Sequence, residues 1–192
     1  MSAANQPDLM TVAEYLDWVT PDGSERWELV EGRPWAMAPS SPLHGMIAAQ
    51  VAYLFGSHLQ DHPRCRGVVE PGVQPRVRGR LNVRIPDYGV TCTPIEPDAR
   101  LLREPVALVE ILSPSNTKDT WANVWSYVSI PAVREILVLH TAQVRADLLV
   151  RSPDSTWPDN AATLGPADVV VLASIGFTAP LAAFYRHVDG RR

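Results

Sequence analysis

The most constraining feature of this chain is a continuous apolar run, residues 105–112, that contains a single carboxylate. The run reads Pro-Val-Ala-Leu-Val-Glu-Ile-Leu, which is typical of a central β-strand buried on both faces. An unpaired charge in such a strand is strongly destabilising. Glu110 must therefore be protonated, paired with an arginine or bound to a metal, unless it lies at an exposed strand end.

The rest of the hydrophobic pattern predicts elements that pack around this strand. Turn residues and apolar spacing indicate helices at 11–19, 43–59, 119–129 and 180–187, a hairpin of 26–31 with 34–38, and further strands within 68–77, 84–91, 135–140, 144–150 and 168–172. This order predicts an α/β (α+β) fold, with a mixed sheet flanked by helices and an N-terminal hairpin extension. A chain of 192 residues is expected to form one domain, 1–192.

Composition narrows the function classes. The net charge of −4 argues against a protein that coats nucleic acid by bulk electrostatics, although it permits a local basic groove. Cys65 and Cys92 are too few for a disulfide framework or a four-cysteine zinc site, and we expect two free thiols in a reducing compartment. Residues 1–8 do not resemble a signal peptide, and no apolar run could span a membrane. We therefore expect a soluble, cytoplasmic protein.

A second carboxylate of the sequence is also notable. Asp87 follows Pro86 at the start of a predicted strand, and 22 residues separate it from Glu110. Taken alone, this is an ordinary turn position. If the two strands are neighbours, both carboxylates meet at one point. Two carboxylates with backbone carbonyls and water suit Mg²⁺ or Mn²⁺ better than zinc.

Several segments resemble the Uma-two family of restriction endonucleases, which belongs to the PD-(D/E)XK nuclease superfamily. The resemblance rests on Pro86-Asp87 and on Val109-Glu110-Ile111-Leu112-Ser113-Pro114-Ser115, and it extends to Trp27 to Gly32, Ser41 to His44, Val133 to Val138 and Leu181 to Phe184. It implies a nuclease-like core with its site at one edge.

The resemblance also implies roles for individual residues. Asp87 and Glu110 would bind the metal, which would activate water and neutralise charge on the scissile phosphate. Glu28 and His44 match family positions that face the same pocket, as further ligand contacts, proton carriers or orienting groups. Taken alone, they are also consistent with a strand residue and a helix-capping histidine. The family suggests a homodimer, which exposed tryptophans at 18 and 35 would help to form.

The chain departs from the superfamily pattern at the lysine. The motif places it two residues after the glutamate, where this chain has Leu112. In the family the lysine appears on the following helix, where this chain has Asn123. An amide can orient water or a phosphate oxygen but carries no positive charge. Lys118, the single lysine of the chain, either reaches the site from the preceding loop or is simply solvated.

A basic stretch offers contacts for a phosphate backbone. Arg76, Arg78 and Arg80 alternate, so on a strand they would share one face, and Arg84 follows them. The same pattern is also typical of a solvated edge strand.

These observations predict a Mg²⁺- or Mn²⁺-dependent endonuclease acting on DNA. The alternatives are a catalytically silent nuclease fold that binds nucleic acid or a protein, and a hydrolase of small phosphorylated substrates.

Overall fold

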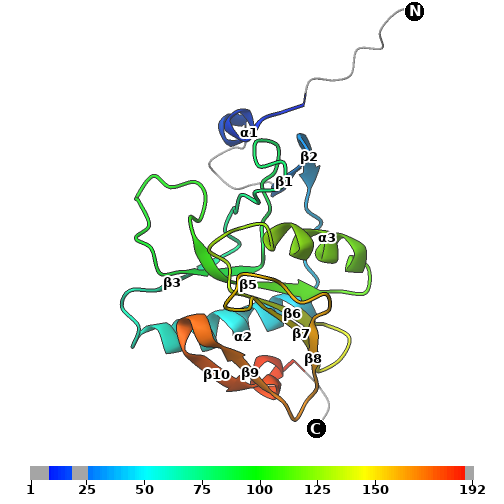
Figure 1. The fold of residues 1–192 in the computed structure, drawn as a ribbon. Coiled ribbons are helices and arrows are strands. Elements are labelled where there is room, and N and C mark those ends of the chain that lie inside the picture. The colour runs from blue at the N-terminus through cyan, green and yellow to red at the C-terminus, as the bar shows by residue number, and fades with distance from the viewer. Residues whose placement is uncertain (1–8, 19–25, 189–192) are drawn as a thin grey trace, which may run out of the picture.

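A six-stranded mixed sheet forms the core of the computed structural model, which describes residues 9–18 and 26–188 (Figure 1). The strands lie in the order β3-β4-β5-β6-β7-β8. Their bounds are β3 (Arg66–Val69), β4 (Tyr88–Thr91), β5 (Pro105–Leu112), β6 (Glu135–His140), β7 (Ala146–Val150) and β8 (Ala162–Leu164). The predicted mixed sheet flanked by helices is confirmed.

Strand β5 occupies an inner position, as its apolar run predicts. It pairs with β4 in antiparallel and with β6 in parallel orientation, and seven of its eight residues are buried. A parallel neighbour requires a crossover connection. Helix α3 (Thr117–Tyr127) supplies it, running from the end of β5 towards the start of β6.

Helices cover both faces of the sheet (Figure 1). Helix α2 (Pro42–Leu59) packs on one face through Ile47, Val51 and Phe55, together with the C-terminal elements. Those elements are β9 (Val169–Leu172), the short 3₁₀ helix η1 (Ala173–Ile175), β10 (Phe177–Pro180) and the 3₁₀ helix η2 (Leu181–Tyr185). Helix α3 covers the opposite face, where Val124 and Tyr127 are fully buried.

An N-terminal extension lies beside the sheet, as predicted. It consists of α1 (Val12–Trp18) and a hairpin of β1 (Trp27–Val30) with β2 (Arg33–Ala36). Glu31 and Gly32 form the turn with φ angles of 51° and 79°, as a tight hairpin turn of the primed type requires. The backbone of Leu29 pairs with Val83, which attaches the hairpin next to the segment that enters β4.

Several predicted elements differ from the structure. The expected strands at 68–77 and 84–91 shorten to β3 and β4, joined by an irregular segment held by an isolated bridge between Val73 and Arg84. Strands β8 and β10 were not predicted, and the predicted C-terminal helix is the 3₁₀ helix η2. The segment 1–8, which does not resemble a signal peptide, lies outside the described residues.

The prediction of two free thiols is wrong, because Cys65 and Cys92 form a disulfide. The register of the sheet explains the pairing. Arg66 pairs with Thr91 across β3 and β4, so the two cysteines stand opposite each other one step beyond the ladder. Among the described residues, no helix is long and apolar enough to cross a membrane.

Candidate active site

Strand register brings Asp87 and Glu110 together. Tyr88 pairs with Val109 in the antiparallel ladder of β4 and β5, so the next position places Asp87 directly opposite Glu110. Cβ atoms of opposed residues lie about 4.5–5.5 Å apart. One oxygen of Asp87, Oδ2, accepts a hydrogen bond from the backbone N–H of Ile111 at 2.7 Å. This bond holds the Asp87 carboxylate over the neighbouring strand.

Glu110 carries a buried carboxyl group at the centre of the site, with the residue only 6% exposed. Its Oε1 accepts a hydrogen bond of 2.6 Å from the hydroxyl of Tyr127, and the carboxyl group of Asp87 lies close enough to influence its pKa. Burial raises the pKa of Glu110 well above its usual range, and the negative charges of Asp87 and Glu28 add to the increase. Glu110 therefore retains its proton at pH values where an exposed glutamate is ionised.

Glu28 approaches from the N-terminal hairpin. Its Oε1 accepts hydrogen bonds from the backbone N–H of Ile85 at 2.9 Å and from Nδ2 of Asn123 at 3.1 Å. Burial raises the pKa of Glu28, while the hydrogen bond from Ile85 and the positive charge of Arg84 oppose this increase. Glu28 thus links the hairpin, the entry to β4 and helix α3.

His44 reaches Asp87 from the first turn of α2. Ser41 caps this helix by accepting a hydrogen bond from the His44 backbone N–H, and Pro42 occupies the first helical position, where its missing N–H is tolerated. The ring atom Nε2 of His44 lies 3.1 Å from Oδ1 of Asp87. His44 therefore contacts the oxygen of Asp87 that Ile111 leaves free.

Helix α3 contributes two polar side chains, one turn apart. Asn123 binds Glu28 and Tyr127 binds Glu110, because residues separated by four positions share a helix face. No role in the site was predicted for Tyr127. Its hydroxyl is nevertheless the donor that satisfies the buried Glu110 carboxyl group, and its position four residues after Asn123 was an available signal.

The structure thus brings Glu28, His44, Asp87, Glu110 and Asn123 into one connected cluster. Lys118 is exposed in the first turn of α3, and no contact joins its side chain to this cluster among the described residues. Its predicted role remains a prediction.

The alternating arginines of residues 76–80 do not lie on a strand as predicted. Residues 76–80 form a turn, with Arg78 at a φ of 46°, so the expectation that Arg76, Arg78 and Arg80 share a strand face is wrong. All three are exposed, and Arg78 pairs with Glu31 at 2.9 Å. Arg84 is instead buried and donates a hydrogen bond of 2.7 Å to the carbonyl oxygen of Leu29. Its charge acts on Glu28 from inside the protein.

Two exposed arginines of this turn face a large hollow beside it. Arg76 and Arg80 line a depression of about 1070 Å³ that extends to the loop 96–105 and to residues 130–132. The walls also carry the acidic residues Glu96, Asp98 and Glu104. The hollow is therefore mixed in charge.

The opposed carboxyl groups of Asp87 and Glu110 offer oxygen donors of the kind that divalent cations prefer. No group of three or more His, Cys, Asp or Glu side chains among the described residues is arranged to hold a metal, so the candidate protein donors are the Asp87–Glu110 pair. Magnesium is commonly held by one or two carboxylates and retains several water ligands. Burial is the main cause of the raised pKa of Glu110, and the repulsion from Asp87 adds to it. A cation at this position would remove that repulsion.

Comparisons with known proteins identify the family of the chain. A model of the Uma2 family, described as "Putative restriction endonuclease", matches residues 12–182. An uncharacterized protein from Synechocystis sp. is 27% identical over 175 residues, which cover 90% of each chain.

A solved structure has the same fold. The crystal structure of a putative nuclease belonging to DUF820 from Anabaena variabilis superposes with a TM-score of 0.71 at 14% identity, covering 94% of this chain and 99% of the other. The family match spans most of the sequence, including all five residues of the connected cluster. The chain belongs to the Uma2 family of putative restriction endonucleases.

Proposed function

We propose that this protein is a Mg²⁺- or Mn²⁺-dependent endonuclease that hydrolyses phosphodiester bonds of DNA. The observation that carries the proposal is the pair of Asp87 and Glu110, which the strand register places opposite each other with Glu110 buried. A structural salt bridge would pair such a carboxyl group with a cation. Here the neighbours of Glu110 are the acids Asp87 and Glu28 and the neutral hydroxyl of Tyr127, as expected of a site that receives its positive charge from a ligand.

Asp87 and Glu110 would hold the metal. When bound, the ion would supply Lewis-acid stabilisation of the scissile phosphate and a more acidic water. Oδ2 of Asp87 is fixed by Ile111 and Oε1 of Glu110 by Tyr127. These bonds orient the two carboxylates in advance, so that less reorganisation is needed when the cation enters.

The remaining residues serve proton transfer and orientation. His44 touches Asp87, and its imidazole is placed to serve as a proton carrier or an orienting group there. Asn123 fixes Glu28, and Glu28 in turn can accept a hydrogen bond from water or hold a proton. We propose that the exposed turn contacts the DNA backbone through Arg76, Arg78 and Arg80. Arg84 is buried, so it would act on the DNA only indirectly, through Glu28.

The second candidate is a catalytically silent member of the fold. It is favoured by Asn123, which contributes an amide where the family pattern has a lysine, and by the absence of contacts between Lys118 and the cluster among the described residues. Losing an electrostatic group of this kind typically lowers a rate by roughly 10²–10³. We therefore expect slow turnover rather than none.

Nicking of supercoiled plasmid tests the proposal. Mg²⁺ or Mn²⁺ should support nicking by the natural protein, EDTA should abolish it, and Glu110→Gln and Asp87→Asn should each reduce it at least 100-fold. Glu135→Gln is the matched control, because Glu135 is a buried acid on the same sheet outside the cluster. Binding of DNA without nicking would favour the silent fold. Equal nicking by all variants would refute the site.

A further inference from the structure

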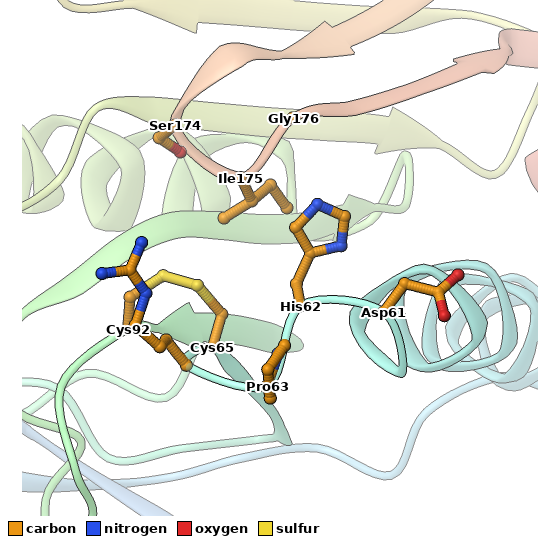
Figure 2. Close-up of a pocket in the computed structure, with 9 residues that line it drawn as sticks. Asp61, His62, Pro63, Cys65, Cys92, Ser174, Ile175 and Gly176 are labelled. Carbon is orange, nitrogen blue, oxygen red and sulfur yellow. A yellow bond between two sulfur atoms is a disulfide. The ribbon is translucent and has the colours of Figure 1, made fainter.

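A second hollow lies away from the carboxylate cluster and contains the disulfide. It measures about 570 Å³ and is formed by residues 61–65, Cys92 and residues 174–176 (Figure 2). The connection after α2 forms one side and the turn around η1 the other. Neither of these segments supplies a residue of the candidate active site.

The disulfide is part of the wall of this hollow. Cys65 and Cys92 are both half-buried and both line the space. They close the open end of β3, an edge strand whose one neighbour in the described sheet is β4. A disulfide at a sheet edge and beside a hollow can be reached by a small molecule without unfolding of the core. Most structural disulfides are protected by burial instead.

The charged groups around the disulfide favour an anionic ligand. Arg64 is exposed and lines the hollow, and among the described residues no hydrogen bond or ion pair engages its guanidinium. Asp61 is the acid of the same wall. Figure 2 places its carboxylate on the far side of His62 from the two cysteines. The positive charge of Arg64 is thus available to an anion that approaches the sulfur atoms.

His62 is arranged to accept a proton in this space. Its Nδ1 lies 3.0 Å from the carbonyl oxygen of His58, and its ring stacks on the His58 ring with centroids 4.2 Å apart. In the neutral ring Nδ1 must donate to this carbonyl, which leaves Nε2 as the acceptor. Nε2 lies beside Gly176, across the hollow.

We propose that Cys65–Cys92 is a reversible thiol–disulfide exchange site for a small thiol that carries a carboxylate. Arg64 binds the carboxylate of the visiting thiol. His62 Nε2 accepts the thiol proton and so generates the attacking thiolate.

The exchange consumes two thiols and forms one disulfide. The thiolate attacks Sγ of one cysteine, the Cys65–Cys92 bond breaks, and the other cysteine leaves as a thiolate that takes up a proton. A second small thiol then attacks the mixed disulfide at the sulfur atom that came from the first small thiol. This step releases the oxidised small disulfide and the second cysteine thiol. Two electrons pass from the small thiols to the protein, and the reverse reaction restores the protein disulfide.

The test measures reduction of the native, oxidised chain by trapping thiols with an alkylating agent and counting them by mass spectrometry. The probes are 3-mercaptopropionate, which carries a carboxylate, and the neutral 2-mercaptoethanol. Each rate is divided by that of the same thiol with an unstructured peptide disulfide. At low salt we expect the anionic thiol to be favoured roughly fivefold, as one unit charge at about 4 Å in water would give. High salt should remove the preference.

Two variants locate the effect. Arg64→Gln should bring the ratio of the two normalised rates close to one, whereas the matched control Arg33→Gln, an exposed arginine on β2, should leave it unchanged. His62→Gln should slow both thiols and preserve the ratio. Equal normalised rates in the natural protein would overturn the proposal. So would reduction at a rate independent of thiol concentration, or a native chain in which both cysteines remain free under an oxidising thiol buffer.

Discussion

Removing the hydroxyl of Tyr127 should destabilise the protein in a way that depends on pH. The residue is fully buried, and its hydroxyl donates 2.6 Å to Oε1 of Glu110. Phenylalanine fills the same ring volume but leaves this oxygen without a donor. A hydrogen bond to a charged group contributes about 1.5–3 kcal/mol, so Tyr127→Phe should lower the free energy of unfolding by about 2 kcal/mol.

This free energy converts into a measurable shift of the melting temperature. The entropy of unfolding is about 2.1 cal/mol/K per residue, or roughly 0.4 kcal/mol/K for a chain of 192 residues. The melting temperature should therefore fall by about 5 °C at alkaline pH, measured by circular dichroism. Tyr53→Phe is the matched control, because Tyr53 is 63% exposed, and it should melt like the natural protein.

The pH dependence follows from the Tyr127 bond, which lowers the pKa of Glu110 against the larger effect of burial. Losing the bond raises this pKa further. The added penalty exists only where Glu110 ionises in the folded natural protein, so it grows as the pH rises through the raised pKa of Glu110. A drop of the same size at pH 5 and pH 9 would refute this account, as would an unchanged melting temperature at pH 9.

Three further predictions concern charge and covalent structure. Asn123→Lys should raise the plasmid-nicking rate at least tenfold, because it places a cation beside Glu28, whereas Asn123→Gln should give no gain. Glu110→Gln should raise the melting temperature of the metal-free protein, and the increase should be larger at pH 8 than at pH 5. The folded state raises the pKa of Glu110, so stability is lost as the pH rises from the ordinary value through the raised one; an equal shift at both pH values would count against this reading. Cys65→Ser opens a covalent loop of 27 residues, which corresponds to about 3.6 kcal/mol of chain entropy. Urea denaturation should show this loss in the variant and in the reduced natural protein alike; a reductant that further destabilises the variant would contradict the assignment to this bond.

The hydrophobic pattern was sufficient to predict the frame of the fold. The apolar run of β5 has one register with its antiparallel neighbour, and this register places Asp87 opposite Glu110. The meeting of the two carboxylates could therefore be predicted from the order of the strands. Helix α3 could be placed from the spacing of Val124 and its apolar neighbours, which carries Asn123 to the same edge.

Features that depend on tertiary contacts could not be predicted in this way. Alternating arginines at 76–80 resemble a strand, yet the segment turns, with Arg76 and Val77 donating backbone hydrogen bonds to Ser129. Nothing in a count of two cysteines indicates that the β3–β4 ladder brings them opposite each other. Arg84 likewise belongs to a basic stretch in the sequence, but the N-terminal hairpin covers it, because Leu29 pairs with the adjacent Val83.

The central claim is that Asp87 and Glu110 hold one divalent ion between them. Anomalous diffraction from a crystal soaked in MnCl₂ tests it most directly, because manganese is located independently of activity. We predict one anomalous peak within about 2.0–2.6 Å of an oxygen from each carboxylate, and its loss in Glu110→Gln. A peak that contacts neither side chain, or no peak at a concentration of Mn²⁺ that supports nicking, would contradict the account.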